Sequence, residues 1–278
     1  HTETLEWSIA CYSGGAGNVP VAEIADWLTN TLGENLYIQV FVAQDSDTLH
    51  CRTVNAQGED VPLFCRLHLW PHEPDEGLPG YQVLDNGFYQ LLPYNSYAGK
   101  ARPGVDKAFS LRYQTNGHTA HKGLKTAVSE MTRIQIQLSE GYCETVDTKT
   151  ELETASWEDA FAHAETVWAD YWKRSGIALE DEFLEHLWYT NTYFLRCLLS
   201  GSSRCPGLFG NWMYEDIGTA WHGDYHMNYN TQQIFWGLMA ANRQELHLPY
   251  VRLSEELLPL SQDWAQNFYH LRGACFPH

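Results

Sequence analysis

The chain has 278 residues, of which 44% are apolar and 19% charged, a globular composition that excludes a disordered chain. Its 17 basic and 35 acidic residues give a net charge of −18, and a field of that sign repels phosphate backbones and argues against a nucleic-acid partner. No apolar run approaches the ~20 residues of a membrane-spanning helix, so no membrane partner is expected.

Residues 1–150 are predicted to form an antiparallel β-sandwich. The segments 36–43, 64–70 and 131–138 are rich in β-branched and aromatic residues or alternate apolar with polar ones, which is typical of strands with one solvent-exposed face. Turn sequences containing Asn or Gly follow such segments at 55–58, 85–87, 115–117 and 139–141. Residues 19–32 fit a short helix or a loop better than a strand.

The hydrophobic period changes near residue 155, and residues 151–278 are predicted to be helical. Ser156-Trp-Glu-Asp159 has the form of a capping box with Asp in place of Glu, which predicts a helix start. An apolar stripe at helical spacing follows, formed by Trp157, Phe161, Ala164, Trp168, Tyr171 and Trp172. The protein therefore belongs to a mixed class, β followed by α.

Three more helices are predicted at 180–199, 230–241 and 246–268. Pro259 is expected to kink or split the last of them. The first is expected to bury Phe183, Leu184, Leu187, Phe194 and Leu198. The helical part lacks a convincing last element, so we expect the chain to be the opening of a larger helical domain.

The seven cysteines, at 11, 51, 65, 143, 197, 205 and 275, are odd in number and contain no Cys-x-x-Cys pair. This pattern argues against a disulfide framework and against a zinc knuckle. It favours a reducing compartment only weakly, so both a cytoplasmic and a secreted location stay open.

Residues 206–236 carry the strongest indication of chemistry. Eight of these 31 residues are aromatic, and short polar side chains lie between them. Aromatic rings cover the C–H faces of a sugar, while amides and carboxylates bind its hydroxyls, so the segment is typical of a carbohydrate site. The alternative is that the many rings simply build a large aromatic core.

Within this segment Asp224, His226, Asn228 and Asn230 occupy every second position. In an extended chain all four would line one face, with Tyr225, Met227 and Tyr229 packed on the other. The alternatives are a polar surface strand and, for Asn230, a partial role as a helix N-cap.

A metal site formed by His222, Asp224 and His226 is a further alternative, because two imidazoles and a carboxylate are common zinc ligands. Gly223 argues against the helix that would place both imidazoles on one face, and the spacing is not His-Glu-x-x-His. We therefore expect no metal or other cofactor.

The motifs 207–212 (Gly-Leu-Phe-Gly-Asn-Trp) and 221–230 (Trp-His-Gly-Asp-Tyr-His-Met-Asn-Tyr-Asn), followed by Gln233 and Trp236, resemble glycoside hydrolase family 95. That family contains α-L-fucosidases and related α-L-galactosidases. The resemblance implies a β-sandwich over 1–150, then a linker helix and the first helices of an (α/α)₆ barrel over 151–278.

The resemblance also implies residue roles. Asn228 and Asn230 would position and polarise the attacking water, and His226 would bind a sugar hydroxyl. The other predicted substrate-binding residues are Trp212, Trp221, His222 and Asp224. The family inverts configuration, and its general acid and assisting carboxylate lie further along the barrel, so the resemblance implies that both fall beyond residue 278. Glu215 and Asp216 do not match the position of the family's acid.

The sequence thus predicts a cofactor-independent exo-glycosidase that removes a terminal α-linked L-fucose or L-galactose type sugar from an oligosaccharide. Three alternatives remain: a phosphorylase or lyase of the same fold, a non-catalytic carbohydrate-binding protein, and a metallohydrolase. The oligomeric state is not predicted.

Overall fold

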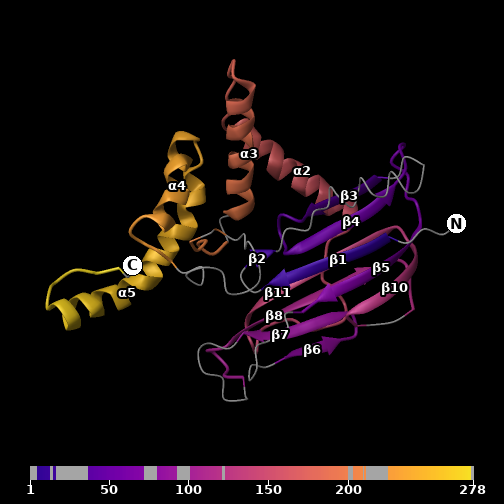
Figure 1. Ribbon diagram of the computed structural model, residues 1–278, viewed down its shortest axis with the longest axis horizontal. Helices are drawn as coiled ribbons and strands as arrows, with labels where there is room; N and C mark the ends of the chain where they lie inside the picture. Colours follow the sequence, from indigo (N-terminus) through magenta and orange to yellow (C-terminus); the bar gives the residue numbers. More distant parts are fainter. Residues whose placement is uncertain are drawn as a thin grey trace. The chain divides into compact units, whose positions relative to one another are not determined.

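The computed structural model describes residues 5–12, 15–16, 37–71, 80–92, 101–120, 123–199, 203–208, 210 and 225–276. The chain divides into two compact units, His1–Val167 and Trp168–His278. The first unit contains all the described strands, and the second consists of helices and their connections (Figure 1). The segment 19–32, predicted as helix or loop, lies outside the described residues.

One sheet of the first unit has five strands in the order β2-β1-β5-β10-β9. Their bounds are Gly15–Ala16, Leu5–Tyr12, Leu63–Trp70, Lys125–Met131 and His118–Thr119. β1 and β5 run parallel, whereas β1–β2, β5–β10 and β10–β9 are antiparallel. The prediction of an antiparallel sandwich is therefore wrong for one pair. β3 and β4 of the other sheet lie between β1 and β5 in sequence, and a parallel pair needs a long connection of this kind, since a tight hairpin joins only antiparallel strands.

The second sheet has six strands in the order β3-β4-β11-β8-β7-β6, all antiparallel. Their bounds are Tyr37–Val42, Thr48–Val54, Arg133–Tyr142, Lys107–Thr115, Gly87–Leu92 and Tyr81–Leu84. The predicted turn at 85–87 closes the β6–β7 hairpin. Gly87 is required there, because a Cβ would overlap the backbone of Leu111 on β8.

The main core lies between the two sheets, which makes the first unit a sandwich. Alternate residues of β5, β8 and β11 point into it, and the buried members are Cys51, Cys65, Leu67, Leu69, Phe88, Phe109, Leu111, Tyr113, Val128, Met131, Ile134 and Ile136. Cys51 and Cys65 are free thiols. Burial raises the pKa of each to about 12, so both act as small apolar core residues.

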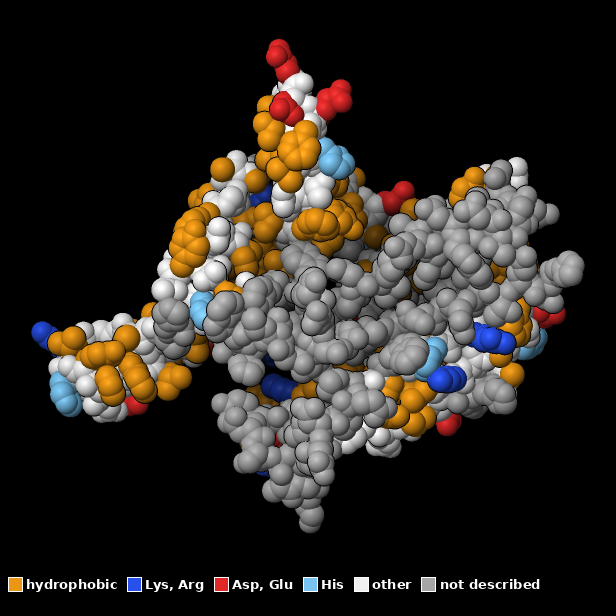
Figure 2. All heavy atoms as spheres, in the orientation of Figure 1, with side chains coloured by type: hydrophobic (Ala, Val, Ile, Leu, Met, Phe, Trp, Pro, Cys, Tyr) orange, Lys and Arg blue, Asp and Glu red, His pale blue; other side chains and the backbone are white. Residues whose placement is uncertain are grey.

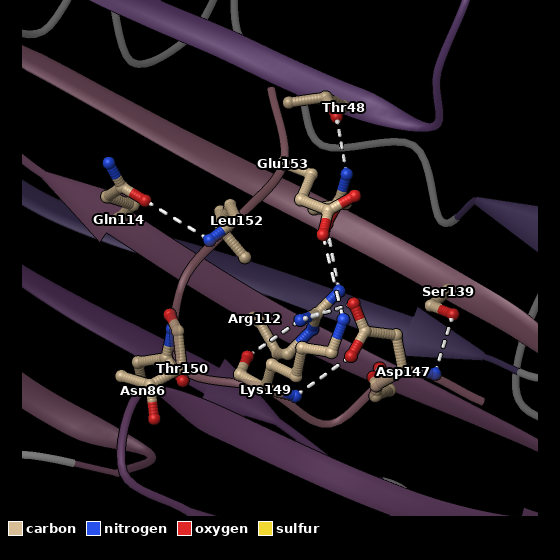
Figure 3. A network of polar contacts seen from close by, with 12 residues as sticks. Thr48, Asn86, Arg112, Gln114, Ser139, Asp147, Lys149, Thr150, Leu152 and Glu153 are labelled. Carbon is tan, nitrogen blue, oxygen red and sulfur yellow. Dashed lines mark hydrogen bonds and ion pairs between the residues drawn. The ribbon is translucent and has the colours of Figure 1, made fainter.

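The opposite face of the six-stranded sheet is covered by residues 147–155, which we call the strap. On β8 the side chains of Ser110, Arg112 and Gln114 alternate with the core residues and bind the strap backbone. Figure 3 shows Arg112 and Gln114 at these contacts. Ser110 Oγ donates to the Asp147 carbonyl oxygen at 2.5 Å, and Arg112 Nη1 donates to that of Lys149 at 2.7 Å.

Arg112 is the centre of this network, although only 1% of its side chain is exposed. Its Nη1 also lies 3.2 Å from the Asp147 carboxylate, and its Nη2 donates to Gln137 Oε1 at 2.8 Å. On β11, Gln135 accepts from the Thr154 hydroxyl at 2.9 Å and donates to the Ala155 carbonyl oxygen at 3.2 Å. The alternation predicted that the polar face of these strands is exposed to solvent. The strap covers this face instead, and its backbone groups make the hydrogen bonds that water would otherwise make.

Helix α2 (Trp157–Lys173) follows the strap, and its start is the predicted one. The Asp159 N–H donates to Ser156 Oγ, whose hydroxyl donates in turn to the Asp159 carboxylate. Trp157 is buried against the ring of Phe41 on β3, and the guanidinium of Arg52 lies 4.8 Å from the centroid of the Trp157 ring. The first turn of α2 is thus fixed to the strap-covered face of the sheet.

His50 on β4 belongs to the same aromatic cluster and should make stability depend on pH. Its ring is buried and stacks on Phe41 with centroids 4.9 Å apart, and burial lowers its pKa below 6.5. Below about pH 6.5 the His50 imidazole therefore binds a proton in the unfolded chain but not in the folded chain. The free energy of unfolding should fall as the pH drops through this range. Thermal unfolding between about pH 7.5 and 5 should show a shallower decline in His50→Phe, and an unchanged slope would contradict this assignment.

The helical unit contains α3 (Glu182–Leu198), α4 (Asn230–Ala240), a 3₁₀ turn (Gln244–His247) and α5 (Leu248–Tyr269), which confirms the predicted helices. Pro259 lies inside α5 without splitting it. The buried core of this unit consists of Tyr171, Leu198, Leu199, Cys205, Phe235, Leu238 and Leu246. None of the described helices combines the length and apolar character needed to span a membrane.

The prediction for the buried face of α3 is mostly wrong. Leu198 is buried, but Phe183 is 72% exposed, and Leu184, Leu187 and Phe194 are each nearly half exposed. Hydrophobic side chains gather over α3 and along the C-terminal half of α5 (Figure 2). An amphipathic pattern indicates which side of a helix is apolar, whereas burial also needs a partner element, and the described residues provide none for most of this face.

Candidate active site

The described part of the candidate site begins at Tyr225, which is anchored in the core of the helical unit. Its hydroxyl donates to the Cys205 carbonyl oxygen at 2.7 Å, and burial raises the pKa of both the Tyr225 phenol and the Cys205 thiol. Met227 is buried, with 6% of its surface exposed. The prediction that these two side chains pack inward is confirmed, so residues 225–227 hold the polar residues that follow them in place.

The prediction that residues 224–230 form an extended segment with alternating faces is wrong for its last residues. Residues 227–229 form a turn, and α4 begins at Asn230. The Thr231 N–H donates to the His226 carbonyl oxygen at 3.0 Å, and the Gln233 N–H donates to that of Tyr229 at 2.9 Å. These bonds curl the chain into the helix, because the first helical N–H groups need acceptors that an extended strand would not bring within reach.

Asn228 and Asn230 are both exposed at the N-terminus of α4. Within the described part of the chain, neither carboxamide makes a hydrogen bond, so both are available to a ligand or a water. α4 begins at Asn230 and its N-cap residue is Tyr229, so Asn230 is the first helical residue rather than the cap. Tyr229 makes no side-chain capping bond. The helix dipole makes this end of α4 favourable for negative charge.

Tyr229 is the residue that alternation misplaced. It is 49% exposed and meets Trp236, itself 57% exposed, edge to face with centroids 5.2 Å apart. The turn at 227–229 leaves Tyr229 exposed instead of packed with Tyr225 and Met227. The signal that could have shown this is the i, i+7 spacing of Tyr229 and Trp236, which places both on one face of a helix that starts near Tyr229.

His226 is half-buried at the start of the turn. The other predicted substrate-binding residues, Trp212, Trp221, His222 and Asp224, lie outside the described residues, as do Glu215 and Asp216. The metal alternative is therefore not tested at its own residues. Among the described residues, no three His, Cys, Asp or Glu side chains gather in a way that could hold a metal ion.

The structure thus places two exposed amides, which make no hydrogen bond within the described residues, at the start of α4, where the exposed ring of Tyr229 contacts that of Trp236 further along the helix. The model of the glycosyl hydrolase family 95 catalytic domain matches residues 116–278, more than half of the chain. The chain belongs to glycoside hydrolase family 95. It is accordingly a glycoside hydrolase whose catalytic-domain match begins just before β9 and includes β10, β11, the strap and every described helix. A search of curated proteins returns no match.

Proposed function

We propose that this family 95 hydrolase is an exo-glycosidase that removes a terminal α-linked sugar of the L-fucose or L-galactose type with inversion. The observation that carries the proposal is the pair of exposed, unengaged carboxamides of Asn228 and Asn230 at the start of α4. They lie within the segment matched by the family's catalytic domain. The family match supports hydrolysis of a glycosidic bond, and the amide pair supports a water-directing site.

In the proposed mechanism, the side-chain oxygens of Asn228 and Asn230 accept the two protons of the attacking water. The water's lone pair is then directed at the anomeric carbon from the face opposite the leaving group. An amide does not take up the proton as hydroxide character develops, so a carboxylate must act as the base. A second carboxylic acid protonates the leaving oxygen, and the two groups are about 6.5–9.5 Å apart in inverting enzymes.

Substrate binding is assigned to His226, with Trp212, Trp221, His222 and Asp224 completing the pocket. Tyr229 and Trp236 add two exposed rings that contact each other, and rings of this kind suit the C–H face of a sugar. We further propose that residues 151–278 form a linker helix and the first helices of an (α/α)₆ barrel, after a sandwich domain over residues 1–150.

The deciding experiment follows the hydrolysis of 2′-fucosyllactose by proton NMR from the first minutes. Inversion predicts that β-L-fucose appears first and then mutarotates to the α anomer. First appearance of α-L-fucose would contradict inversion. Release of a sugar 1-phosphate that requires phosphate would favour the phosphorylase alternative, and loss of turnover in a chelator would favour the metallohydrolase.

A further inference from the structure

The phenol of Tyr225 joins two parts of the chain that are separate in the sequence. Tyr225 lies shortly before the turn that carries Asn228 and leads into α4. Its hydroxyl donates to the carbonyl oxygen of Cys205 at 2.7 Å. Cys205 in turn comes just before the motif 207–212. Both ends of this hydrogen bond belong to the second compact unit, Trp168–His278.

The Cys205 end of this bond is fixed in the core of the helical unit. Cys205 is buried and belongs to the core cluster. Among the described residues its carbonyl oxygen receives no backbone N–H, and the Tyr225 phenol is the donor that satisfies it. The chain then turns tightly, because the Gly210 N–H donates to the Gly207 carbonyl oxygen at 3.0 Å. The phenol therefore ties this turn to the one that precedes α4.

The Tyr225 end is connected to the two asparagines by a short stretch of hydrogen-bonded backbone. The residue after Tyr225 is His226, whose carbonyl oxygen accepts from the Thr231 N–H at 3.0 Å. Thr231 is completely buried. The backbone that carries Asn228 and Asn230 is therefore closed between residues 226 and 231. A shift of Tyr225 would move this closed segment, and both carboxamides with it.

We propose that Tyr225 is a positioning residue for the hydrolysis, which acts through Asn228 and Asn230 rather than on the substrate. The inference rests on the proposed function, because that function assigns to the two carboxamides the task of holding the attacking water. A displacement of about 1 Å in a group that aligns reactants can cost about 100-fold in rate. The hydrogen bond from Tyr225 to Cys205 limits such displacement, since it fixes the start of the segment that carries both amides.

Tyr171 on α2 provides a matched control in the same core. Its hydroxyl donates to the carbonyl oxygen of Thr192 on α3 at 2.8 Å, so each of the two tyrosines makes one phenol-to-carbonyl bond. Burial raises the pKa of both phenols. Tyr225→Phe and Tyr171→Phe each remove one oxygen and keep the ring. Both variants should therefore fold, with the melting temperature lowered by about 2–4 °C.

Steady-state kinetics on an aryl α-L-fucoside, well below both melting temperatures, separates positioning from stability. We expect Tyr225→Phe to lower kcat about tenfold with KM within about threefold of the parent, and Tyr171→Phe to keep kcat within about twofold. In the Asn228→Ala/Asn230→Ala double variant, adding Tyr225→Phe should change kcat by less than about twofold, because no amide is left to align. Amide exchange over residues 226–233 should be faster in Tyr225→Phe than in the parent, and unchanged in Tyr171→Phe.

Equal kcat in Tyr225→Phe and Tyr171→Phe would overturn the proposal. So would a loss of kcat from Tyr225→Phe that is as large in the double asparagine variant as in the parent. The failures are distinguishable: if the parent hydrolyses the fucoside and Tyr225→Phe keeps its kcat, the proposed function stands and the positioning role fails. If the parent does not hydrolyse it, while exchange over 226–233 is faster in Tyr225→Phe alone, the proposed function fails and the role of Tyr225 in holding this segment stands.

Discussion

Alanine at Asn228 or at Asn230 is expected to lower kcat on an α-L-fucoside by at least about 100-fold, with a much smaller change in KM. The reason is that each carboxamide orients the water in the transition state, and one lost contact of this kind costs about 10²–10³ in rate. Steady-state kinetics of the two single variants measures the effect. Because the two amides act on one water, the double variant should lose less than the product of the two single losses.

Asn267 provides the matched control for these variants. It is an exposed asparagine on α5 whose amide donates to Asp263 at 2.7 Å, one helical turn away. Asn267→Ala should leave kcat within about twofold of the parent. If Asn228→Ala and Asn230→Ala also retain turnover within about tenfold of the parent, the water-directing role is wrong, and the two amides do not take part in the reaction.

Arg112→Ala is expected to cause the largest loss of stability, about 3 kcal/mol in the free energy of unfolding of the first unit. The substitution leaves the Lys149 carbonyl oxygen, Gln137 Oε1 and the Asp147 carboxylate without their cationic donor. The Asp147 side chain is 32% exposed, so water recovers part of the ion-pair energy and keeps the loss below that of a wholly buried pair. Amide exchange in peptides of β8 and β11 measures the change locally.

Two variants set the limits of this prediction. Arg112→Lys keeps the charge but loses the planar fork that reaches several acceptors at once, so it should be destabilised by about half as much. Arg66→Ala, at an exposed position on β5, should change the free energy by less than about 1 kcal/mol. Equal exchange rates in Arg112→Ala and the parent would mean that the strap does not depend on Arg112.

The sandwich and the helices could be predicted because their signals are local. Four signals depend only on neighbouring residues: the β-branched and aromatic residues of 36–43, the alternation over 131–138, the turn at 85–87 and the capping sequence at Ser156. The structure contains the corresponding elements. The parallel β1–β5 pair depends on the path of some 50 intervening residues, and no local pattern reports it.

The strap shows a different limit of prediction. Ser110, Arg112 and Gln114 have the alternation of a solvent-exposed face, and polar residues look the same whether water or a peptide backbone satisfies them. Residues 147–155 likewise carry no pattern, because the sheet binds mainly their backbone groups. The candidate site shows the same limit. The motif predicted Asn228 and Asn230 as site residues, but it could not predict the turn that exposes Tyr229, which depends on the hydrogen bond from the Thr231 N–H to the His226 carbonyl oxygen.

The contacts of the strap and of the first turns of α2 with the six-stranded sheet determine where a fragment containing the first unit should end. A fragment cut at residue 150 would lose Thr154 and Ala155, the partners of Gln135, and Trp157, the partner of Phe41 and Arg52. Its six-stranded sheet would then present bare rings and unsatisfied amides, a surface prone to self-association and precipitation. An expression fragment that ends near Val167, part-way along α2, keeps this cover in place and is the better choice for titrating the sandwich alone.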